Sequence, residues 1–260
     1  MSDSPQDPSD RSDSNADDPK RKPREKKQRS FWRELPILII VALLLSFLLQ
    51  TFVARVYLIP SESMEPTLHG CAGCTGDRIV VEKIGYRFGE PKPGDVVVFR
   101  GPDSWNSEFV STRSSNTVVR GAQEIGSLIG VVAPDENDLV KRVIAIGGQT
   151  VECCDDQGRV LVDGKPLDEP YITMDFPFTP GTLTCDTELK SGRCFAPVTV
   201  PEGNIWVMGD NRSNSADSRF HVSDELTGTV PVDNVIGKAF LIALPPSRWG
   251  SIDSPNIQGQ

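Results

Sequence analysis

Two serines lie two positions apart in a proline-containing segment, with Ser61 and Ser63 placed between Pro60 and Pro66. In extended backbone, side chains two residues apart point to the same side. One hydroxyl could therefore attack a carbonyl carbon while the other, with a backbone N–H, stabilises the oxyanion that forms. A turn of serine and proline is the alternative interpretation, and the pattern alone does not decide between the two.

A serine nucleophile needs a base, and the chain has only two histidines, His69 and His221. A metal site built from several histidines is therefore excluded, and a Ser-His-Asp triad has just two possible bases. We interpret both histidines as surface or loop residues without a catalytic role. A hydrolytic mechanism then requires a different base.

The chain has 27 Lys and Arg residues against 36 Asp and Glu, a formal net charge of −9. Residues 20–34 are strongly basic, so the rest of the chain carries a larger negative net charge than the whole. A folded part of this charge is poorly suited to neutralise phosphates, and we expect no nucleic-acid partner. With 38% hydrophobic residues, the chain can bury the core of one large domain or two small ones.

Residues 35–54 contain no charged side chain and consist mostly of Leu, Ile, Val and Phe. A helix of this length spans about 30 Å of hydrocarbon, which predicts a transmembrane helix. A cleaved signal peptide would have a shorter apolar core, and a buried core helix would have a polar stripe. Residues 1–34 are predicted to be a disordered tail whose basic cluster, next to the membrane, keeps this end cytoplasmic. Residues 55 onward are then expected across the membrane.

The rest of the chain has a β-rich pattern. Short runs of Val and Ile predict strands at 56–59, 78–84, 95–100, 139–146, 150–152, 159–162, 198–200, 205–208 and 235–244. No helical pattern alternates with them, so we predict an antiparallel barrel or sandwich. We expect this domain at 55–250, with a polar loop insertion at 101–138 that holds one helical pattern at 122–129, and a flexible tail at 251–260.

Most of the residues that could take part in catalysis lie in four segments: Ser61–Leu68, Gly76–Lys83, Lys141–Gly148 and Gly209–Arg219. In this order, behind an apolar N-terminal helix, they resemble the sequence boxes of the type I signal peptidases, over roughly residues 30–245. The resemblance implies a membrane-bound serine endopeptidase that cleaves signal peptides from exported preproteins without a cofactor or metal. It also implies a mostly antiparallel β catalytic domain with a smaller β-extension at about 150–200.

The resemblance further implies a Ser-Lys dyad, with Ser63 as the nucleophile and Lys141 as the general base. Ser61, together with Ser63, matches the oxyanion hole, and Ser215 matches the residue that orients the lysine by a hydrogen bond. Structural support is implied for Asp210, Asp217 and Arg219. A lysine at position 141, rather than a histidine, is similar to the bacterial members and implies a bacterial plasma membrane.

A lysine is a useful base only when its ammonium is desolvated, because a pKa of about 10.4 leaves it charged at neutral pH. On its predicted strand Lys141 shares a face with Leu139, Val143 and Ala145, which is the apolar setting required. Lys83, which also lies on an apolar predicted strand, is the competing candidate, and spacing alone does not choose between them.

A preprotein bound in extended form beside the strand leading to Ser63 would aim its −1 and −3 residues at the enzyme. Shallow apolar pockets at those positions would accept only small residues, which gives the small-x-small rule of signal-peptide cleavage sites. The resemblance matches four residues to pocket walls: Tyr57, Ile59, Met64 and Val140. Ordinary core packing is the alternative for each of them.

All cysteines follow the apolar helix: Cys71, Cys74, Cys153, Cys154, Cys185 and Cys194. An extracytoplasmic location favours disulfides, and we expect Cys185 and Cys194 to close a short loop. The pairing of the other four stays open. A zinc site made from those four thiolates is the alternative.

Two other classes of protein fit the sequence less well. A self-cleaving repressor with a Ser-Lys dyad would need a DNA-binding N-terminal domain, and residues 1–34 are too short and too polar for one. A non-catalytic anchored binding domain would have no use for Ser63 and Lys141. We therefore predict an enzyme whose partners are signal-peptide-bearing preproteins and the lipid membrane.

Overall fold

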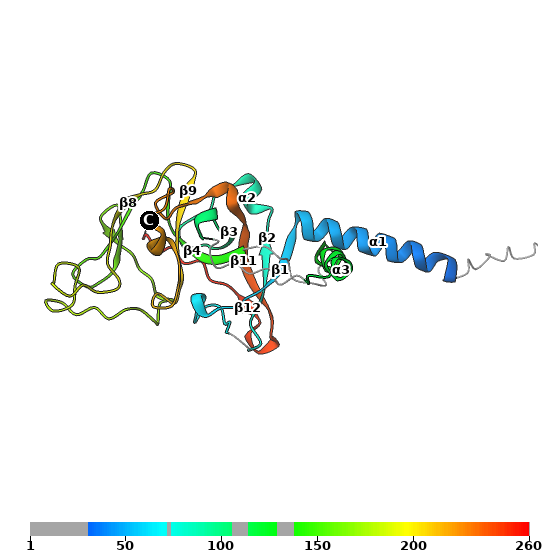
Figure 1. Cartoon of the computed structure of the whole chain (residues 1–260), viewed down its shortest axis with the longest axis horizontal. Coiled ribbons are helices and arrows are strands. Elements are labelled where there is room, and N and C mark those ends of the chain that lie inside the picture. Colours follow the sequence, from blue (N-terminus) through cyan, green and yellow to red (C-terminus); the bar gives the residue numbers. More distant parts are fainter. Residues whose placement is uncertain (1–30, 72–73, 106–113, 129–137, 260) are drawn as a thin grey trace, which may run out of the picture. The chain divides into compact units, whose positions relative to one another are not determined.

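The computed structural model describes residues 31–71, 74–105, 114–128 and 138–259 (Figure 1). The chain divides into two units, 1–40 and 41–260, and the long helix α1 (Phe31–Phe52) crosses that division. Within α1, the segment Glu34–Phe52 is long and apolar enough to span a membrane. The helix ends two residues before the predicted limit of 54. The predicted tail at 1–34 lies outside the described residues up to position 30.

The second unit contains a large antiparallel sheet with the order β1-β2-β11-β3-β4-β9-β10, and β12 pairs with β11. Its strands are β1 (Ala54–Leu58), β2 (Arg78–Glu82), β3 (Val96–Arg100), β4 (Asp138–Ile146), β9 (Asn204–Met208), β10 (Val230–Pro231), β11 (Val235–Leu244) and β12 (Gly250–Ser251). The mostly antiparallel β fold predicted from the Val- and Ile-rich runs is thereby confirmed.

A second, smaller antiparallel sheet has the order β7-β6-β5-β8. Its strands are β5 (Thr150–Cys153), β6 (Val160–Val162), β7 (Lys165–Pro166) and β8 (Phe195–Thr199). It lies in the part of the chain where a smaller β-extension was expected. We call residues 150–200 the extension.

The helical elements outside α1 are short. They comprise the helices α2 (Gly85–Phe88) and α3 (Thr117–Leu128), and the 3-10 turns η1 (Glu62–Met64), η2 (Asp103–Trp105), η3 (Ser218–His221), η4 (Val232–Asn234) and η5 (Pro246–Arg248). The helical pattern predicted at 122–129 falls in α3 up to residue 128. Much of the predicted loop insertion, at 106–113 and 129–137, lies outside the described residues.

The core lies on both faces of the large sheet, and β3 shows this most clearly. Its residues Val96 and Val98 pack in one buried cluster, while Val97 and Phe99 pack in another. Because successive side chains of a strand point to opposite faces, a strand with four fully buried residues must be covered on both sides. This explains why the sequence there is a continuous apolar run.

The C-terminal segment corrects one prediction. Residues 251–260 were expected to form a flexible tail, but Ile252 packs in the same cluster as Tyr57, and Ile257 packs with core residues of both sheets. The Gln258 side chain also donates a 3.0 Å hydrogen bond to the Ile144 carbonyl. Burial of the two isoleucines offsets the entropy of ordering this polar segment.

Candidate active site

The two residues expected to form a dyad meet in the structure. Ser63 lies in η1, just beyond the end of β1, and Lys141 lies in β4, between β3 and β9. Lys141 Nζ donates a 2.8 Å hydrogen bond to Ser63 Oγ. Ser61 Oγ lies 3.3 Å from the same oxygen. A nucleophile, an amine and a second hydroxyl therefore share one small volume, as acyl transfer requires.

The lysine is almost completely removed from water, since its exposed fraction is 4%. Desolvation lowers the pKa of Lys141 to about 8, and it outweighs the charges of Asp217 and Asp210, which act to raise it. The apolar face predicted around Lys141 is only partly right. A bulge between Val143 and Ala145 places Ala145 in a different core cluster from Val143.

The other candidate bases contact residues other than Ser63. Lys83 donates from Nζ to the Gln50 carbonyl at 3.2 Å, at the end of α1. His69 pairs with Glu65. His221 lies 3.1 Å from Asp224 and stacks on the ring of Trp105. Among the described residues, Lys141 is thus the base candidate in contact with Ser63.

Asp210 connects the serine-bearing and lysine-bearing segments. It accepts two hydrogen bonds from Arg142, at 2.9 Å and 2.7 Å, and one from the Thr67 hydroxyl at 2.5 Å. Arg142 is the neighbour of Lys141, and Thr67 follows Ser63 by four positions. Because the ion pair between Arg142 and Asp210 is buried and bidentate, it fixes both the distance between the two side chains and their relative orientation.

Asp217 and Arg219 form a second buried ion pair beside the lysine, with Arg219 Nε 2.9 Å from the carboxylate. The same carboxylate accepts the Gly209 backbone N–H at 3.0 Å. Burial acts to raise the pKa of Asp217, but the hydrogen bonds and the charge of Arg219 outweigh it and lower the pKa. The carboxylate therefore stays ionised and adds a negative charge near Lys141.

Ser215 does not make the contact that the resemblance implies. Its Oγ is buried and has no hydrogen-bond partner among the described residues, so the hydrogen bond to Lys141 is not formed. The hydroxyl faces Gly209 instead. A Cβ added to Gly209 would lie 2.2 Å from Ser215 Oγ and 2.4 Å from the Ser63 carbonyl oxygen. Ser215 thus packs close to Ser63, and Gly209 between them leaves room for both residues.

The four predicted pocket residues lie together. Tyr57, Ile59 and Met64 are buried in one cluster, and the partly buried Val140 packs against it. They therefore take part in core packing, the alternative weighed for them, and they do so in the segments that carry the dyad.

All six cysteines are paired, with none free. Cys185 is joined to Cys194, and the pairings that the sequence left open are Cys71 with Cys74 and Cys153 with Cys154. Because Cys71, Cys74, Cys153 and Cys154 all form disulfides, they do not supply the four thiolates of the alternative zinc site.

Several residues of the site were missed. Arg142, Thr67 and Asn211 lie inside the four quoted segments, so their position there was a usable signal. Glu169 and Tyr171 lie in the extension, where no motif marks them. Glu169 binds the Arg212 guanidinium, and the Arg142 guanidinium lies 4.0 Å from the centre of the Tyr171 ring.

Known proteins are similar to this chain over most of its length. The family described as "Signal peptidase, peptidase S26" matches residues 32–244. Signal peptidase I of Mycobacterium tuberculosis is 58% identical over 243 residues, which cover 91% of this chain and 80% of that protein. Probable signal peptidase I of Mycobacterium leprae is 55% identical over 248 residues, covering 90% and 83%. Signal peptidase I T of Bacillus subtilis is 30% identical over 223 residues, covering 85% and 89%. The chain therefore belongs to the signal peptidase family, peptidase S26.

Proposed function

We propose that this chain is a membrane-anchored signal peptidase in which Ser63 is the nucleophile and Lys141 is the general base. Cleavage of signal peptides by a serine peptidase follows from the family. The assignment of the two residues is supported by one observation above all, the 2.8 Å hydrogen bond between Lys141 Nζ and Ser63 Oγ.

In the proposed mechanism, neutral Lys141 takes the Ser63 proton as Oγ attacks the carbonyl carbon of the scissile bond. The Ser61 hydroxyl and the Ser63 backbone N–H stabilise the negative oxygen of the tetrahedral intermediate. Protonated Lys141 then gives its proton to the leaving amine, which frees the mature chain and leaves an ester on Ser63. Water, deprotonated by Lys141, hydrolyses that ester and restores the enzyme.

Substrate selection is proposed to follow from the strand that leads to Ser63. A signal peptide bound in extended form beside β1 would present its −1 and −3 residues to the cluster of Tyr57, Ile59, Met64 and Val140. Because three of these side chains are already packed in the core, only shallow pockets are available, and small residues fit them.

The membrane arrangement is proposed from α1 and the charges before it. Glu34–Phe52 serves as the single span in the bacterial plasma membrane. Residues 20–33 include eight Lys and Arg, which favours a cytoplasmic N-terminus and an extracytoplasmic catalytic domain. The partners are then signal-peptide-bearing preproteins and the lipid around α1.

Cleavage of a peptide with a small-x-small site by the detergent-solubilised protein tests this function. Ser63→Ala and Lys141→Ala should each abolish cleavage, because nucleophile and base act as one unit. Ser61→Ala should lower the rate by roughly 10²–10³. Lys83→Ala is the control, because the Lys83 side chain contacts the Gln50 carbonyl rather than Ser63, and it should cleave like the parent. Full activity in Ser63→Ala or Lys141→Ala would overturn the dyad.

A further inference from the structure

One asparagine holds the backbone on both sides of the nucleophile's α-carbon. The Asn211 N–H donates to the Ser63 carbonyl at 3.1 Å, and its side-chain Nδ2 donates to the Glu62 carbonyl at 3.2 Å. Asn214 Nδ2 adds a 3.1 Å hydrogen bond to the Glu62 carboxylate. Asn211 is buried, so these hydrogen bonds are protected from competition by water.

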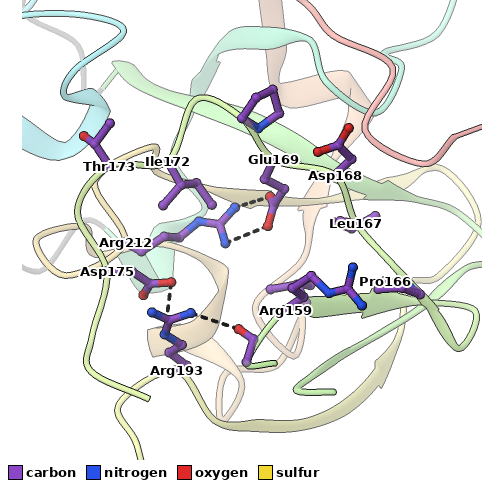
Figure 2. A pocket seen from close by; sticks show the side chains of 13 residues that line it. Arg159, Pro166, Leu167, Asp168, Glu169, Ile172, Thr173, Asp175, Arg193 and Arg212 are labelled. Atoms are coloured by element: carbon purple, nitrogen blue, oxygen red, sulfur yellow. Dashed lines mark hydrogen bonds and ion pairs between the residues drawn. The ribbon is translucent and has the colours of Figure 1, made fainter. Parts of the chain in front are cut away.

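Asn211 is held in turn by the extension. It pairs with Met174 in a parallel bridge, and the next N–H, that of Arg212, donates to the Met174 carbonyl at 2.9 Å. The Arg212 guanidinium reaches back to the Glu169 carboxylate with two hydrogen bonds (Figure 2). Arg212 Nε also donates to the Gly209 carbonyl at 3.1 Å. A buried bidentate pair thus joins the extension to the loop that grips Ser63.

The segment next to Met174 is fixed by the disulfide-closed loop. Arg193, beside Cys194, donates from Nε to the Phe176 carbonyl at 2.6 Å and lies 3.3 Å from the Asp175 carboxylate. Figure 2 shows the Arg193 guanidinium turned toward Asp175 in the same cavity that Arg212 and Glu169 line. Ser191 Oγ donates to the Pro177 carbonyl at 2.7 Å.

We propose that residues 169–175 of the extension are a positioning element for Ser63, and that they act through Asn211. The inference rests on the proposed function, because it assumes that Ser63 is the nucleophile. Neither Glu169 nor Arg193 is bonded to the dyad. Their effect is to fix where Asn211 places the Ser63 carbonyl, and hence where Oγ lies relative to Lys141 Nζ. Displacement of a reacting atom by about 1 Å lowers a rate by up to roughly 10²-fold.

Arg193→Gln is the first test, because the Arg193 side chain is one-quarter exposed, whereas the Glu169 and Arg212 side chains are buried. Arg159→Gln is the matched control. Arg159 lines the same cavity, but its side chain pairs with Asp155. For Arg193→Gln we expect kcat to fall roughly 10-fold, with KM within twofold of the parent. The pH midpoint set by Lys141 should not move, because its burial is unchanged. Arg159→Gln should match the parent.

A double-mutant cycle then tests the part of the route that runs through the Asn211 side chain, because Asn211→Ala removes the hydrogen bond to the Glu62 carbonyl and keeps the backbone N–H. Asn211→Ala alone should lower kcat, and adding Arg193→Gln should lower it by less than the product of the two single effects. If Arg193→Gln does not fold, Glu169→Gln takes its place in the same cycle. Unchanged kcat in a folded Arg193→Gln or Glu169→Gln variant, or single effects that multiply fully, would overturn the inference. A parent protein that cleaves no signal peptide would instead overturn the proposed function.

Discussion

The proposed role of Lys141 as the base can be tested through the pH dependence of the rate. Since burial lowers its pKa to about 8, the amine is mostly protonated below that pH and cannot accept the Ser63 proton. We expect kcat/KM to rise with pH through a midpoint near 8, which a pH–rate profile measures directly. His69→Ala and His221→Ala should keep this profile. A midpoint of about 6.5 that disappears in either histidine variant would indicate a histidine base instead.

Gly209 lies against Ser63 and Ser215 and leaves no room there for a side chain. A methyl group there would meet the Ser63 carbonyl oxygen and the Ser215 side chain at 2.2–2.5 Å, so backbone must move. We expect Gly209→Ala to lower kcat by roughly 10²-fold. Gly121→Ala is the control, because no atom lies within 4 Å of the added methyl group. Parent-like kinetics for Gly209→Ala would mean that the nucleophile segment adjusts freely.

At the scale of the elements, the disulfide-closed loop contributes to the stability of the extension. Cys185 and Cys194 are nine positions apart, and closing a loop of this size is worth about 2–3 kcal/mol in the chain-entropy model. In the double variant Cys185→Ser, Cys194→Ser, the free energy of unfolding should fall by that amount, so the protein should unfold at a lower denaturant concentration. A chemical denaturation curve without reductant measures it. A double variant as stable as the parent would show that the loop adds no stability.

The strands of the large sheet were predictable because their apolar runs are local, and β2, β4 and β11 lie within the predicted ranges or one residue beyond them. The contact between Ser63 and Lys141 was predictable because both residues lie in segments that resemble the sequence boxes of the family. The contacts of Glu169 and Tyr171 were not, since they depend on how the extension packs against Arg212 and Arg142. Pairings between segments far apart in the chain leave no periodic pattern.

The burial of residues 252 and 257 was missed for a related reason. In the polar segment 251–259, two isolated isoleucines give no helical or strand period. They are buried because two core clusters have room for one large side chain each. Within the part of the chain that the structure describes, the Ser215 hydroxyl has no hydrogen-bond partner, and this too depends on packing, here against Gly209.

For the whole molecule, the charges before α1 predict which side of the membrane holds the active site. In intact cells whose outer face is accessible, added protease should digest the domain after residue 55 and spare an epitope placed before residue 20. Immunoblotting of both parts gives the readout, and detergent lysis, which should expose both, is the control. Digestion of the epitope with the domain spared would reverse the proposed orientation.

The strand order also bears on how the enzyme is made. The pair β1-β2 flanks the Ser63 segment, β3 and β4 lead to and carry Lys141, and β11 lies between β2 and β3 in the sheet. β11 begins at Val235, far later in the chain than either catalytic group. In the proposed orientation, Ser63 and Lys141 would emerge during export on two segments that are not yet joined by strand pairing, and non-local pairing of this kind forms slowly. A half-exported chain would be latent, and the protease would acquire activity only after β11 joins the two halves of its sheet.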